Sequence, residues 1–82
     1  MRLPATVNAT WIATLENEQL REAESRLHEL FRVQEKREKA RAGDRYSMMR
    51  GPETLISAWH RWLMVNNEAL HRGMVLRRVP KA

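Results

Sequence analysis

Apolar side chains recur along the chain at the spacing of helical turns. Within residues 9–42, one stripe at the 3.6-residue period contains Ile12, Leu20, Ala23, Leu27, Leu30 and Phe31, with Glu16 as a polar interruption. Within residues 52–72, a second stripe contains Leu55, Ile56, Trp59, Trp62, Leu63, Asn66, Ala69 and Leu70. The alternation typical of a strand never persists. The pattern predicts an all-α fold with two helices, at about 9–42 and 52–72.

Glycine and proline mark the expected helix boundaries. Gly43 is the expected stop of the first helix, because glycine readily adopts the left-handed conformation found after helix ends. Gly51 is expected as the N-cap of the second helix, with Pro52 as its first residue. Gly73 follows a basic last turn and is its expected stop. Candidate N-caps for the first helix are Asn8 and Thr10.

The linker at residues 44–50 is short, so the two helices should be antiparallel neighbours. Counting outward from this linker places Trp62 opposite Leu30 and Phe31, and Asn66 opposite Leu27. The large side chains should therefore meet in the middle of an antiparallel two-helix hairpin. At 33 residues or so, the first helix would outrun the second.

The size of the chain limits its core. Its 82 residues predict a single helical-hairpin domain, 1–82, with residues 1–7 and 74–82 as less ordered tails. Two helices bury only one seam, and the absence of cysteine removes disulfides as a source of stability. We therefore expect association, either as a homodimer that forms a four-helix bundle or with a partner protein.

The expected interface combines stripe residues with apolar residues that lie off the stripe. These residues are Trp11, Leu15, Leu27, Leu30, Phe31, Trp59, Trp62, Leu63, Asn66 and Leu70. An alternative is that the linker and the tail cover such side chains within one chain. Asn66 is of special interest, because an amide in an apolar seam can fix helix register and oligomeric state at a cost in stability. On that hypothesis, Asn66→Leu should raise stability.

The net charge of +5 makes an acidic partner such as nucleic acid the alternative to a protein partner. The candidate phosphate-binding residues are Arg32, Lys36, Arg37, Lys39, Arg41, Arg45, Arg50, Arg77 and Arg78. In a simple hairpin, the bases near the loop and those in the tail would lie at opposite ends, and acids dilute the first group. The basic residues therefore favour a solvated surface over a nucleic-acid site.

The sequence contains few candidate residues for metal binding or catalysis. No two of the three histidines have the spacing that places two metal ligands on one helical face, and Glu68 and His71 form a lone Glu-x-x-His pair. Every glutamate is expected on a charged face, and no serine has the context of a nucleophile. We expect no metal, no cofactor and no enzymatic activity.

No apolar run approaches the length of a membrane span, so a soluble, cytoplasmic protein without membrane contacts is expected. The sequence favours a small helical adaptor, chaperone-like subunit or regulator that acts by protein association, either with itself or with another protein. The alternative is a nucleic-acid-binding helical bundle that uses the basic residues of the loop end and the tail.

Overall fold

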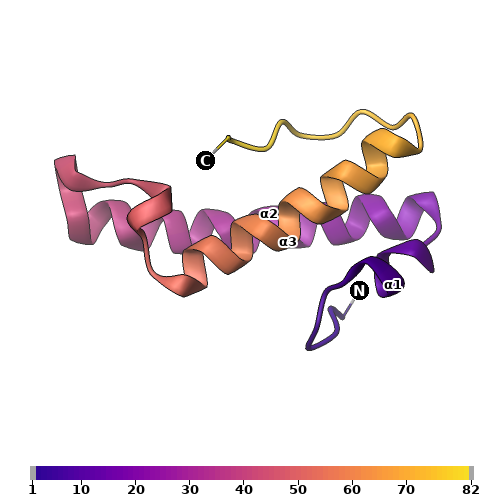
Figure 1. Cartoon of the computed structure of the whole chain (residues 1–82), viewed down its shortest axis with the longest axis horizontal. Coiled ribbons are helices and arrows are strands. Elements are labelled where there is room, and N and C mark those ends of the chain that lie inside the picture. The colour runs from indigo at the N-terminus through magenta and orange to yellow at the C-terminus, as the bar shows by residue number, and fades with distance from the viewer. Residues whose placement is uncertain (1, 82) are drawn as a thin grey trace.

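A computed structural model describes residues 2–81, which contain helices and connecting segments but no strand. Helix α1 spans Ala9–Ala13, α2 spans Asn17–Ala42 and α3 spans Glu53–His71. Two 3-10 turns, Gly43–Arg45 and Met48–Arg50, form the connection between α2 and α3. The two long helices pack side by side, which confirms the predicted all-α fold with two long helices in contact (Figure 1). Met1 and Ala82, the outermost residues of the predicted domain and its tails, lie outside the described residues.

The first helix differs from the prediction because it is broken into α1 and α2. The Thr14 hydroxyl donates to the Trp11 carbonyl at 2.6 Å, and hydroxyls that bond to nearby backbone compete with helix continuation. Glu16 then takes an extended backbone conformation and starts α2 with a capping box, in which its N–H donates to Gln19 Oε1 at 2.9 Å. Asn8 caps α1, because its Oδ1 accepts from the Trp11 N–H at 2.9 Å. The residues by which the first helix was expected to outrun the second therefore form the separate helix α1.

The glycines end the long helices as predicted. Gly43 has a φ of +57° after Ala42, and Gly73 has a φ of +77° after α3. At the second site, the Gly73 N–H donates to the Leu70 carbonyl at 3.0 Å and the Met74 N–H donates to the Ala69 carbonyl at 2.8 Å, which is a Schellman motif. Pro52 is the N-cap of α3 and Glu53 its first residue, one position later than predicted.

The core runs along the seam between α2 and α3. The ring centroids of Phe31 and Trp62 lie 5.2 Å apart, so these side chains meet as the sequence predicted. Leu27, Leu55 and other apolar residues fill the seam and are completely buried. Leu30 was expected opposite Trp62 but is 42% exposed, because it lies at the edge of the buried face of α2.

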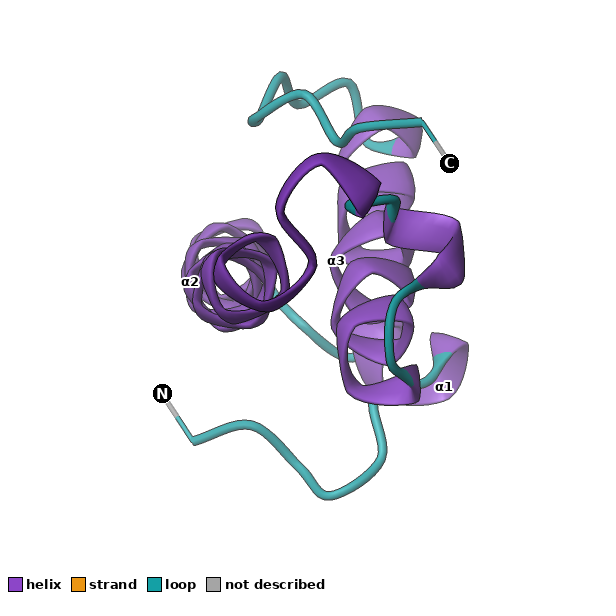
Figure 2. Ribbon diagram, turned by 90° about the vertical axis from the view of Figure 1, so that its left-hand side faces the viewer, coloured by secondary structure: helices purple, strands orange, loops and turns teal. Residues whose placement is uncertain are grey.

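Both ends of the chain return over α3. Figure 2 shows α2, α1 and the C-terminal segment arranged around this helix. Leu15 and Met74 are buried in the same core as the seam, and the C-terminal residues Leu76 and Val79 pack against it. The expected less ordered segment 74–82 therefore follows α3 over its described part. Leu15 and Met74 are therefore covered within the chain, as the alternative to an interface between chains proposed.

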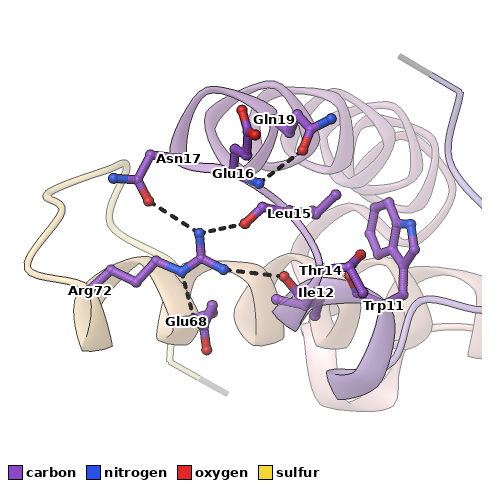
Figure 3. Close-up of polar contacts among 9 residues, drawn as sticks. All are labelled: Trp11, Ile12, Thr14, Leu15, Glu16, Asn17, Gln19, Glu68 and Arg72. Atoms are coloured by element: carbon purple, nitrogen blue, oxygen red, sulfur yellow. Dashed lines mark hydrogen bonds and ion pairs between the residues drawn. The ribbon is translucent and has the colours of Figure 1, made fainter.

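Arg72 fastens the break between α1 and α2 to the end of α3 (Figure 3). Its Nη1 donates to the Leu15 carbonyl at 2.7 Å and to Asn17 Oδ1 at 3.1 Å, and its Nη2 donates to the Ile12 carbonyl at 3.4 Å. Its Nε donates to Glu68 Oε2 at 2.7 Å, which orients the guanidinium. Arg72 thus supplies a donor to the Leu15 carbonyl at the helix break and a second donor to the Ile12 carbonyl, which also accepts from the Leu15 N–H at 3.1 Å.

We predict that Arg72→Ala lowers the free energy of unfolding by about 2 kcal/mol, because charge-assisted hydrogen bonds to partly buried carbonyls are lost together. Urea denaturation followed by circular dichroism measures this change. The control is Arg78→Ala, which removes an exposed arginine without an ion pair among the described residues. Equal losses in the two variants would contradict a special role for Arg72.

Candidate interaction surfaces

A buried carboxylate joins α2, α3 and the C-terminal segment. Glu24 on α2 is 2% exposed. Its Oε2 accepts a hydrogen bond from the indole Nε1 of Trp62 at 2.7 Å, and its Oε1 accepts one from Nη1 of Arg77. A buried charge is tolerated when it is paired and hydrogen-bonded, and both conditions are met here. The expectation that every glutamate lies on a charged face is therefore wrong for Glu24.

His28 lies beside this carboxylate. Its ring is 4.9 Å from the Trp62 ring between centroids. Burial lowers the pKa of His28, and the positive charges of Arg77 and Arg32 lower it further, against an opposing effect of Glu24. The imidazole is consequently neutral at pH 7 and packs as an aromatic ring.

Two more hydrogen bonds hold the C-terminal segment on α3. The Asn66 amide donates from Nδ2 to the Arg77 carbonyl at 2.6 Å, and the Trp59 indole donates from Nε1 to the Pro80 carbonyl at 2.7 Å. Together with Trp62, these are the polar groups of the α3 stripe that the sequence assigned to an interface. The structure shows all of them satisfied within the chain. Their use between chains stays a prediction.

The predicted interface residues fall into three groups by burial. Leu15, Leu27, Phe31, Trp59, Trp62 and Asn66 are buried within the chain, Trp11 and Leu63 are half-buried, and Leu30 and Leu70 are exposed. Leu70 is 58% exposed on α3, and Val33, also exposed, lies near Leu30 on α2. Of the predicted set, Leu30 and Leu70 present the most surface to a partner.

A groove runs along the face of α3 that points away from Leu63 and Asn66. It consists of two adjoining hollows of about 400 and 680 Å³ that share Glu53, Ser57 and Arg61. We call it the α3 groove. Its wall on the α2 side is Leu27, Leu30 and Gln34, and its wall on the other side is Ala5, Thr6 and Val7.

Arg61 lies on the floor shared by the two hollows and is half-buried. Within residues 2–81, no hydrogen bond or ion pair engages its guanidinium. The sequence placed Arg61 on the solvent side of its helix, and it missed the groove because the opposite wall comes from residues 5–7. The partly apolar walls, with exposed Leu30 on one of them, and the unpaired cation make this groove a candidate binding surface.

The basic residues proposed for nucleic acid divide by their partners. Lys39 pairs with Glu35 at 3.8 Å, Arg41 pairs with Glu38, and Arg77 pairs with Glu24. No ion pair within the described range involves Arg32, Lys36, Arg37, Arg45, Arg50 and Arg78.

The C-terminal segment turns back along α3 (Figure 1), so the expectation that its bases lie at the opposite end from those near the loop is wrong for Arg77 and Arg32. Arg77 and Arg32 both lie close enough to His28 to act on its pKa, second to the effect of burial. The returning segment thus adds positive charge beside α2.

Several other titratable groups make structural contacts. A hydrogen bond from Arg41 lowers the pKa of Glu38, and burial raises the pKa of Tyr46, so both keep their ordinary charge states at neutral pH. Glu68, from the lone Glu-x-x-His pair, orients Arg72. In the part of the chain that is described, no group of three or more acids, histidines or cysteines could hold a metal ion, and no helix is long and apolar enough to cross a membrane.

Comparison of the chain with protein-family models, curated proteins and solved structures finds no match. Its function therefore has to be inferred from the surfaces described above.

The hydrogen bond from Asn66 reverses the effect that the sequence suggested for its replacement. We predict that Asn66→Leu lowers the free energy of unfolding by about 1 kcal/mol, because the Arg77 carbonyl loses its donor and the C-terminal segment loses an anchor. Urea denaturation followed by tryptophan fluorescence measures the change. Asn67→Leu is the matched control, since the neighbouring amide is exposed. A more stable Asn66→Leu variant would restore the original hypothesis of an amide that specifies an oligomer.

Proposed function

We propose that this protein is a non-enzymatic helical adaptor, chaperone-like subunit or regulator that acts by protein association. The observation that carries this proposal is the α3 groove, an open hollow on α3 between α2 and residues 5–7, with partly apolar walls and exposed Leu30 on its rim. Exposed apolar surface next to a concave hollow is typical of interaction sites. Amphipathic helices commonly bind such grooves through their apolar face.

The polar groups of the molecule favour association over catalysis. Both oxygens of the buried Glu24 carboxylate are engaged by donors from other segments. Glu68 and Asn66 likewise hold other parts of the chain. These groups stabilise the fold, whereas a general base needs access to a substrate proton.

Self-association is best supported by a second apolar surface, formed by Leu70 and Val75, both exposed at the end of α3 and the start of the following segment. Asn67 is an uncharged α3 neighbour of Leu70, whereas Arg77, Arg78 and Lys81 line the same hollow as Leu70. In a symmetric dimer each surface meets its own copy, so a contact centred on Leu70 would place these basic side chains at its solvated rim. The α3 groove, with the unpaired Arg61, is less suited to self-pairing.

We predict that the purified protein sediments as a dimer and that Leu70→Glu converts it to a monomer, because four carboxylate oxygens would then meet at the interface. Sedimentation equilibrium over a range of concentrations measures the change. Val33→Glu, on exposed α2 surface, is the control and should leave the dimer intact. A wild-type monomer with a cooperative melt at every concentration would remove self-association.

Nucleic-acid binding is the second candidate, and the return of Arg77 toward Arg32 favours it. We predict that any such binding weakens steeply between about 50 and 200 mM salt, because phosphate contacts release counterions. Fluorescence anisotropy with duplex DNA and RNA tests this, with Arg32→Ala expected to reduce the slope against salt. Absence of binding at about 50 mM salt would remove this candidate.

A further inference from the structure

The α3 groove has a defined length. Its floor on α3 extends from Glu53 to Met64. These twelve residues are separated by eleven steps of about 1.5 Å, which give roughly 17 Å and match about three turns of a docked helix. Ala58 and Ser57 provide a small-residue floor in the middle, and small side chains allow another helix to approach closely.

Positive charge lies on two sides of the apolar part. Arg61 rises from the floor without a partner in the described structure. Arg37 follows Leu30 by two helical turns and therefore lies on the same side of α2, also without an ion pair in the described residues. Glu53, at the loop end of the floor, is the acid that lines both hollows. Arg61 is therefore the cation in the middle of the groove, whereas the loop end carries both Arg37 and Glu53.

The charges select the type of occupant. A half-buried guanidinium forms its strongest bonds with a carboxylate, often through two parallel hydrogen bonds. A second copy docked symmetrically would bring the same arginines together, which disfavours it. The complementary partner has an apolar stripe and an acidic residue facing Arg61.

Resting on the proposed role in association, we propose that the α3 groove binds an acidic amphipathic helix of another protein. Its apolar side chains lie against Leu30 and Ala58, and a carboxylate on the same helix pairs with Arg61.

Two designed peptides test the proposal. Both are 18-residue helices with the same leucine stripe, and their flanking positions carry glutamate in one and lysine in the other. Titration into the labelled full chain is followed by NMR, which locates the site, and by fluorescence anisotropy, which gives the Kd. We expect the glutamate peptide to bind about tenfold more tightly than the lysine peptide, with shifts at Leu30, Ala58 and Arg61.

Variants of the chain supply the controls. Arg61→Glu should reverse the preference between the peptides, and Arg61→Gln should abolish it while leaving the fold unchanged, since Arg61 has no partner in the described chain to lose. Arg50→Glu is the matched control with the same charge change on an exposed arginine outside the groove, and it should preserve the preference. Equal binding of the two peptides, or equal effects of Arg61→Glu and Arg50→Glu, would overturn the proposal.

The remaining outcomes separate this proposal from the broader one. Binding that is lost in Leu70→Glu but not in Arg61→Glu overturns the groove as the site and leaves association in place. If neither peptide binds a chain that still forms dimers, the groove is likewise overturned as the site and association stays in place. Failure of both peptides with a monomeric chain overturns both proposals. Binding of a single-stranded oligonucleotide at Arg61, without binding of the glutamate peptide, overturns the protein partner and supports nucleic acid.

Discussion

The carboxylate of Glu24 lies where α2, α3 and the C-terminal segment meet, and the rest of the arrangement depends on it. Trp62 fills the centre of the seam, and its indole N–H needs an acceptor once it is buried. Glu24 supplies that acceptor, but a buried carboxylate needs a cation of its own, and Arg77 provides it from the C-terminal segment. The tryptophan in the seam is thus linked through Glu24 to the segment after α3, which turns back along the helices.

The hydrogen bonds of polar side chains on α3 explain which sides of this helix are covered and which side is open. Trp59 and Asn66 bind main-chain carbonyls of the returning segment on one side. Arg72, directly after the last residue of α3, holds the α1–α2 connection at the C-terminal end of this helix. Between α2 and the N-terminal residues, the middle of α3 has no such cover, and the α3 groove with Arg61 lies there. The proposed association surfaces are thus what remains after the polar groups of α3 have found partners within the chain.

Periodicity and glycine positions were sufficient to predict the all-α fold, the ends of α2 and α3 at Gly43 and Gly73, and the contact between Phe31 and Trp62. They missed the break before α2, because a short interruption hardly alters the helical period and the hydroxyl bond of Thr14 is a local backbone effect. The hydrogen bonds from Trp59 and Asn66 to the C-terminal segment were beyond prediction for a different reason. Their acceptors are main-chain carbonyls, which every residue carries, so no side-chain pattern marks them.

The returning segment also bears on where a partner can bind. It is joined to α3 through Gly73, so its local concentration at Trp59 and Asn66 is of the order of millimolar, and a separate chain would have to displace it. A partner that used those side chains would lose affinity by the factor by which the bound state of the C-terminal segment is favoured over its released state. The α3 groove requires no displacement, because its floor and walls are already open. Binding there is therefore favoured over exchange with the C-terminal segment, even though that segment covers more of the residues the sequence singled out.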